Sequence, residues 1–433
     1  MLDAVSLALI ISALIILIGF LGNYLFKKTG LPDMLILIFL GALFGPILGV
    51  FDPDVVRNFA PYIAALALAY ILFDGGMGLN IKRVFHNSPK AVLLSILGFT
   101  TSVLGVCAFT VVVFNVPLLY GLLFGSIVGG SSSVVVISLA SKIKISQKGS
   151  IILILESALT DILCIVISLS LIDVIVTGHA DLGAIGVGIV SKFLIGISIG
   201  VVMGFAWLFA LRKVANIPFS YMLTLGIILL GYAVTEGLGG SGALSALIFG
   251  LILGNERELF KIFKINDGKD EDEKVLFSVS KGLRRFQAEI AFLIRTFFFV
   301  FLGIIVSISS LSLLISGVII SLILFVTRFG AVWISTRNSP LKGDQKIMTV
   351  VFTRGLAAAV LATLPAQYGM PYAGLFIDIA VVVIVTTAIM ATIGTLIIGY
   401  QKANSVNGKK NGAEPSNAPI LPKKLESLNP KKA

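Results

Sequence analysis

The chain has 433 residues, of which 57% are apolar and 13% are charged, and its mean hydropathy is +1.04. Repeated apolar runs of about 18 to 28 residues are typical of a polytopic, all-α membrane protein and argue against a soluble catalytic domain. We therefore expect a protein that is not an enzyme and that uses no cofactor.

The apolar runs predict about thirteen transmembrane helices. The first run ends at Lys27 and Lys28 and lacks the basic start and cleavage site of a signal peptide, so we interpret it as an anchor. In chain order, the predicted spans are residues 5–26, 33–50, 59–79, 90–114, 117–140, 149–174, 185–210, 218–236, 241–254, 286–308, 311–335, 346–366 and 372–399.

Basic residues are concentrated in the loops on one side of these spans. Most of the 33 lysines and arginines fall there, whereas Arg57 alone falls in a loop on the other side. By the positive-inside rule, the N-terminus lies outside and the C-terminus lies in the cytoplasm. The net charge of +11 therefore reflects membrane orientation, and we expect no nucleic-acid partner.

Two cytoplasmic segments differ from the spans in composition. Residues 255–285 form a loop of mixed charge, and residues 401–433 form a basic tail rich in Lys, Asn, Pro and Gly that we expect to be disordered. The tail is either a solvated tether or a contact with anionic membrane lipid.

An internal similarity predicts two repeats within a transmembrane domain at 1–400. The segment from Leu37 to Gly45 in the second span resembles the segment from Leu247 to Gly254 in the ninth. Repeat one then covers about 5–174, a linker helix covers 185–210, and repeat two covers about 218–399. The odd offset inverts the second copy, an architecture that secondary transporters use.

The third span carries one carboxylate, Asp74, about 8 Å from its cytoplasmic end. Asp74 could attract cations into a cytoplasmic funnel, or it could cap the end of a helix. The sequence leaves both interpretations open.

The fifth and twelfth spans hold unusual clusters of small and polar residues. The fifth contains Gly129 and Gly130 followed by Ser131–Ser133, and the twelfth contains Thr353, Arg354 and Gly355. Such residues suit either a broken helix whose freed backbone groups face an ion, or close packing between intact helices. Because the two spans occupy matching positions in the repeats, we favour two broken helices that cross.

In the sixth span, Asp161 lies about 18 Å along the helix and therefore near the bilayer centre. An ionised aspartate at that depth costs at least about 2.5–3.5 kcal/mol, which indicates a functional site. The spacing places Ser157, Thr160, Asp161 and Cys164 on one helical face. The expected ligands of an alkali cation are Asp161, Thr160, Ser157, Ser131 and Ser132. Burial favours the protonated form of a lone carboxylate, so a proton and a cation would compete for Asp161.

Glu156 requires a partner of its own, because an unpaired charge within a membrane is costly. It lies about 10 Å from the cytoplasmic end of its span, and Arg354 lies about 12 Å from the cytoplasmic end of the twelfth. We therefore predict a structural ion pair between Glu156 and Arg354. Arg295, in the tenth span, is the rival partner.

Several motifs together resemble the monovalent cation/proton antiporters, especially their NhaP-like sodium/proton branch. Glu156, Ser157 and Asp161 match the Glu-Ser-x-x-Asn-Asp motif of that family, and Arg354-Gly355 matches its Arg-Gly pair. Phe73–Gly76 resembles the acidic-Gly-Gly end of its third span, and Arg295–Gly303 resembles its Phe-rich tenth span. The similarity covers nearly the whole chain.

This resemblance implies a homodimer in the plasma membrane of a prokaryote, in which a core domain moves against a dimerisation domain. It also implies exchange of Na⁺ for H⁺, with K⁺ for H⁺ as the alternative. Two positions depart from the NhaP-like pattern, because Ser131–Ser133 replaces Thr-Asp-Pro and Thr160 replaces Asn. The paired serines resemble the potassium-efflux branch.

Other classes of function predict different roles for the same residues. A carrier of organic anions on this fold would bind its substrate through Arg354 and Arg295. A channel fits less well, because one central carboxylate beside glycine-rich breaks suits an occluding site. An intramembrane aspartyl protease needs two facing aspartates at mid-depth, and Asp161 is alone there. We expect electroneutral antiport of one monovalent cation for one proton.

Overall fold

The structure is a computed structural model that describes residues 4–29, 31–51, 56, 59–78, 89–132, 145–178, 182–214, 219–256, 258–259, 270–306, 310–337 and 339–411. Within these ranges the regular elements are helices. The first part of the chain contains α1 (Ala4–Thr29), α2 (Asp33–Ala42) with a π-helical turn η1 (Leu43–Ile47), α4 (Ala60–Gly78), α6 (Pro89–Phe114), α7 (Leu118–Val128) and α9 (Gln147–Thr177).

The next helix, α10 (Leu182–Val214), lies where the sequence predicts a linker. The last part of the chain contains α11 (Ser220–Gly237), α12 (Gly242–Gly254), α14 (Asp270–Ile305), α15 (Leu311–Thr336), η2 (Pro340–Asp344), α16 (Gln345–Val350), α17 (Leu356–Gln367) and α18 (Ala373–Asn411). Each predicted span thus contains at least one helix. Among the described helices, seven are long and apolar enough to cross a membrane, and the others are shorter apolar helices. The all-α membrane fold is confirmed.

Two boundaries differ from the prediction. Residues 270–285, expected in a loop, form the first part of α14, and residues 401–411, expected to be disordered, extend α18. Residues 412–433 and 260–269 lie outside the described residues.

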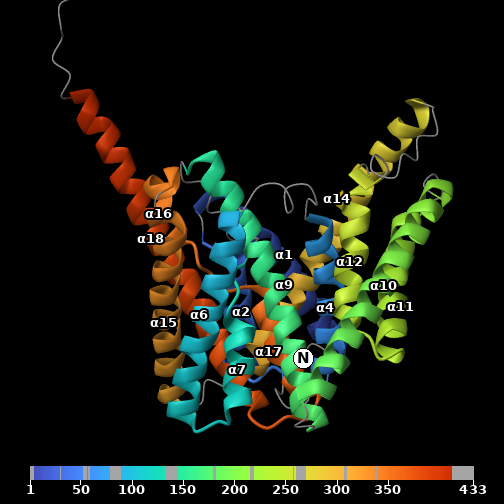
Figure 1. The fold of residues 1–433 in the computed structure, drawn as a ribbon, viewed down its shortest axis with the longest axis horizontal. Coiled ribbons are helices and arrows are strands. Elements are labelled where there is room, and N and C mark those ends of the chain that lie inside the picture. Colours follow the sequence, from blue (N-terminus) through green and yellow to red (C-terminus); the bar gives the residue numbers. More distant parts are fainter. Residues whose placement is uncertain are drawn as a thin grey trace, which may run out of the picture.

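The helices form two groups that pack mainly within themselves. The first group contains α6, α7, α9, α15, α16, α17 and α18, and the second contains α1, α2, α4, α10, α11, α12 and α14. In Figure 1, α6, α7, α15 and α18 stand on one side of the bundle, and α10, α11 and α12 stand on the other. Contacts between the groups run through α17 against α4 and through α9 against α10.

Close helix packing agrees with the predicted inverted repeat. A Cβ atom on Gly41 of α2 would lie 2.0 Å from the carbonyl oxygen of Val300 in α14, and one on Gly250 of α12 would lie 2.0 Å from that of Phe73 in α4. Glycine is therefore required at both positions. The α2–α14 contact thus has an equivalent in α12–α4, as expected if the second span of each repeat packs on the third span of the other. Gly41 and Gly250 lie in the two similar segments that start at Leu37 and Leu247, so the sequence similarity reflects a similar close contact.

Candidate functional site

The long helix α9 supplies most of the polar side chains at the centre of the first group. Ser157, Thr160 and Cys164 are 0%, 1% and 2% exposed, whereas Asp161 is partly exposed. These side chains follow the spacing that places them on one helical face. Asp161 interacts electrostatically with the Cys164 thiol and with the Arg354 guanidinium.

The chain leaves the helical conformation after α7, and its freed backbone groups turn toward α9. The Ser131 carbonyl accepts a hydrogen bond from the Ser157 hydroxyl at 2.7 Å, and the Ser131 N–H donates to Thr160 Oγ1 at 3.2 Å. The Ser131 hydroxyl donates to Glu156 Oε1 at 3.1 Å. The break in the fifth span is therefore confirmed, and α9 compensates the backbone hydrogen bonds lost there. Ser133 lies outside the described residues.

The second break lies between α16 and α17, at residues 351–355, and it meets the first. The Ser132 N–H donates to the Thr353 carbonyl oxygen at 2.7 Å, and the Arg354 N–H donates to Thr387 Oγ1 of α18 at 3.1 Å. A Cβ atom on Gly355 would lie 2.3 Å from Ser132 Oγ. The two extended segments can therefore cross only because residue 355 has no side chain.

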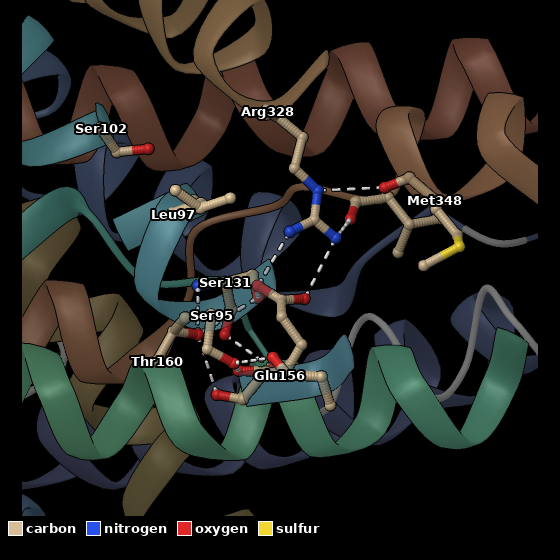
Figure 2. A network of polar contacts seen from close by, with 12 residues as sticks. Ser95, Leu97, Ser102, Ser131, Glu156, Thr160, Arg328 and Met348 are labelled. Atoms are coloured by element: carbon tan, nitrogen blue, oxygen red, sulfur yellow. Dashed lines mark hydrogen bonds and ion pairs between the residues drawn. The ribbon is translucent and has the colours of Figure 1, made fainter. Parts of the chain in front are cut away.

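Glu156 forms its ion pair with Arg328 of α15 and not with Arg354 as predicted. Arg328 Nη1 lies 2.8 Å from Glu156 Oε1, and Nη2 donates to Oε2 at 3.1 Å. Figure 2 shows Glu156 between Ser131 and Arg328, whose guanidinium also reaches the Met348 carbonyl oxygen. Both side chains are almost fully buried.

The C-terminal end of α16 explains why Arg328 takes this position. The break leaves carbonyl groups without helical partners, and Arg328 donates to the Met348 oxygen at 3.0 Å and to the Val351 oxygen at 3.4 Å. One guanidinium thus satisfies two carbonyls and one carboxylate, which compensates for burying the charge. Equal depth in the membrane, the basis of the predicted pair, does not distinguish Arg328 from Arg354.

Arg354 is 3% exposed and lies close to this pair without replacing Arg328. Its charge interacts with Glu156 and Asp161, and it is repelled by Arg328. Among the residues that the structure describes, its Nε atom has no hydrogen-bond partner. Arg354 therefore adds positive charge beside both carboxylates.

A family model for transmembrane sodium/hydrogen exchangers matches residues 10–398. The chain belongs to the sodium/hydrogen exchanger family. The chain is also 28% identical to the K(+)/H(+) antiporter NhaP2 of Shewanella sp. (strain MR-4), over 90% of this chain and 66% of that protein. It is 28% identical to the Probable Na(+)/H(+) antiporter 2 of Methanocaldococcus jannaschii, over 65% of each chain. The chain thus spans just under two thirds of the length of these relatives.

The fold is also similar to that of a solved exchanger. The structure of the sodium proton antiporter MjNhaP1 from Methanocaldococcus jannaschii at pH 8 aligns with a TM-score of 0.71 and 22% identity, covering 90% of this chain and all of that one. This agreement supports the inverted-repeat architecture with two broken helices.

In this member of the exchanger family, Arg295 forms its ion pair with Asp33. Arg295 Nη2 donates to Asp33 Oδ2 at 3.1 Å and links α14 to the start of α2. Arg295 also interacts electrostatically with Asp74 of α4, which is partly buried. The rival pairing of Glu156 with Arg295 is therefore wrong, and Arg295 belongs to a separate cluster in the second helix group.

Sequence reasoning missed the roles of Arg328, Asp33 and Thr387. Arg328 carried a usable signal, because a charge deep in an apolar span is expected to have a buried partner. Asp33 lies at a span boundary and Thr387 in an ordinary apolar run, so neither had a signal of that kind.

Proposed function

We propose that this chain exchanges a monovalent cation for a proton by alternating access, and that the cation and the proton compete for Asp161. The observation that carries the proposal is the crossing of two broken helices beside Asp161, which gathers hydroxyl and carbonyl oxygens from Ser131, Ser157 and Thr160. Alkali cations require several oxygen ligands when they lose their water. Membership of the exchanger family supports the same reaction.

The proposed reaction balances one charge against one charge. Asp161 binds either a proton or a cation together with oxygens of Thr160, Ser157, Ser131 and Ser132. Exchange of one proton for one monovalent cation then moves no net charge. The sequence resemblance favours sodium, whereas two relatives that match 90% and 89% of this chain are named as K(+)/H(+) antiporters, so both cations are candidates.

A flux assay in proteoliposomes tests this function and identifies the cation. We expect that adding Na⁺, K⁺ or Li⁺ outside vesicles with an acidic lumen will release internal protons, reported by a pH-sensitive dye. With Na⁺ or Li⁺ and equal K⁺ on both sides, the rate of electroneutral exchange should be the same with and without a potassium ionophore that clamps the membrane potential at zero, whereas electrogenic exchange would become faster. No proton movement with any of the three cations would contradict the proposal.

The charges around Arg354 disfavour the alternative, a carrier of organic anions. An anion that approached Arg354 would meet the charge of Glu156 and Asp161, with which Arg354 already interacts. Arg328 and Arg295 are held by Glu156 and Asp33. The arginines that an anion carrier would use are therefore already compensated by carboxylates.

Alternating access requires the two helix groups to move against each other, and an ion pair crosses their boundary. Lys192 of α10 pairs with Asp173 of α9. The Lys192 carbonyl oxygen also accepts a hydrogen bond from the Ser241 N–H at 3.1 Å, which ties Lys192 to the start of α12. Asp173 and Lys192 therefore report the position of one group relative to the other.

We expect that cross-linking this boundary will stop exchange reversibly. In an Asp173→Cys/Lys192→Cys variant, a short bifunctional methanethiosulfonate reagent should abolish cation-driven proton flux, and dithiothreitol should restore it. Each single-cysteine variant treated in the same way serves as a control, because the native Cys107 and Cys164 are buried. Full exchange in the cross-linked protein would show that this boundary does not move during transport.

We place the protein in the plasma membrane of a prokaryote as a homodimer in contact with lipid, with the N-terminus outside and the C-terminus in the cytoplasm. Asp74, at the cytoplasmic end of α4, would attract cations into a funnel between the helix groups. The transmembrane domain at 1–400 would carry the exchange, with 401–433 as a cytoplasmic extension.

A further inference from the structure

Thr387 holds the second break from the middle of α18, where its side chain is 0% exposed. Its Oγ1 atom accepts a hydrogen bond from the Arg354 N–H at 3.1 Å and donates to the Val383 carbonyl oxygen at 2.7 Å. The hydroxyl is therefore used both as an acceptor and as a donor. Arg354 has no helical partner for its N–H in the extended segment, so Thr387 supplies one.

Thr160 does the same for the first break. Its Oγ1 atom accepts from the Ser131 N–H at 3.2 Å and donates to the Ser157 carbonyl oxygen at 3.0 Å. Thr160 lies on the long helix that follows the broken helix of repeat one, and Thr387 lies on the long helix that follows the broken helix of repeat two. In each predicted repeat, one threonine hydroxyl thus accepts a hydrogen bond from a backbone N–H group in the break.

The two segments whose N–H groups bind these threonines also contact each other directly. The Thr353 carbonyl oxygen, one residue before Arg354, accepts from the Ser132 N–H at 2.7 Å. Gly355, one residue after Arg354, lies against the Ser132 side chain. A shift of Arg354 therefore moves both of its neighbours, and with them the backbone of Ser132 next to the oxygens of Ser131.

We propose that Thr387 is a positioning residue of the exchange site, which keeps the two breaks in register so that the Ser131 and Ser132 oxygens face a cation at Asp161. This inference rests on the proposed cation exchange. Thr387 itself does not touch the cation, and its effect is transmitted through Arg354, Thr353 and Ser132. Thr387 is thus distinct from the ligands expected from the sequence.

The test compares Thr387→Val with Thr387→Ser in proteoliposomes. Valine keeps the shape and removes the hydroxyl, so we expect the half-saturating cation concentration to rise about tenfold, as for the loss of one buried hydrogen bond. The maximal rate per folded transporter should change much less, and Thr387→Ser should restore the wild-type value. Thr392→Val is the matched control, because Thr392 donates to Ala388 of its own helix at 2.8 Å.

An unchanged half-saturating concentration in Thr387→Val, or an equal rise in Thr392→Val, would overturn the inference. Absence of exchange in the wild type would instead overturn the proposed function. If Thr387→Val does not fold, hydrogen–deuterium exchange of the wild type decides, because the Arg354 amide should be protected by Thr387. Rapid exchange of that amide would contradict the assignment.

Discussion

Asp161→Asn is expected to abolish cation-driven proton movement while the protein remains folded. Asparagine keeps the size of the side chain, but it can neither release a proton at neutral pH nor offer a charge to a cation. Among the described residues, Arg354 interacts electrostatically with both Asp161 and Glu156, but Glu156 is held in an ion pair by Arg328 and is therefore not expected to replace Asp161. The measurement is dye-reported proton flux in proteoliposomes on addition of Na⁺, K⁺ or Li⁺.

A matched control separates the loss of this site from a general effect of removing a carboxylate. Glu289→Gln changes a carboxylate to an amide in an exposed ion pair with Arg285 on α14, and exchange should remain at the wild-type level. Retention of exchange in Asp161→Asn would mean that protons and cations do not compete for this residue. A search for another carboxylate, beginning with Asp74, would then be required.

Arg328→Met is expected to destabilise the protein by about 3–5 kcal/mol, because it leaves Glu156 buried without its partner. The Met348 and Val351 carbonyls would lose a donor at the same time. The loss of stability is measured by heating the protein in detergent and recording the temperature at which it begins to aggregate. A Glu156→Gln/Arg328→Met variant should recover part of the stability, because an amide costs less to bury than a charge.

Variants of two other arginines provide the control and test the alternative pairing of Glu156 with Arg354. Arg285→Met removes a charge from the exposed Arg285–Glu289 pair and should cost less than about 1 kcal/mol. If Arg354→Met proves far more destabilising than Arg328→Met, then Arg354 is the energetically important partner of Glu156, as the sequence alone had suggested. Equal stability of Arg328→Met and the wild type would also rule out the Arg328 pair.

Several features of the fold could be predicted because they depend on position along the chain. Hydropathy locates apolar runs, and each run predicted as a span contains a helix near the same residues. The composition of Gly129–Ser132 and Thr353–Gly355 marked both breaks, since small residues tolerate close contact and extended backbone. The spacing of Ser157, Thr160 and Cys164 predicted a shared face, and all three side chains are buried.

The partners of the charged and polar groups could not be predicted in the same way. Depth along the membrane normal follows from counting residues, and at equal depth Glu156 could have met Arg354, Arg295 or Arg328. The choice depends on the angle around each helix axis and on which helix packs beside α9. Arg328 of α15 is the partner of Glu156 because it also donates hydrogen bonds to two carbonyl oxygens at the end of α16.

By itself, therefore, the sequence determined the membrane class, the approximate spans, the two breaks, the repeat and the polar face of α9. Tertiary structure alone decided that Glu156 pairs with Arg328, that Arg295 pairs with Asp33, and that Thr387 holds Arg354. The physical reason is that hydropathy and helical period act within one segment, whereas a buried charge or N–H group is satisfied by whichever neighbour packing brings within hydrogen-bond distance.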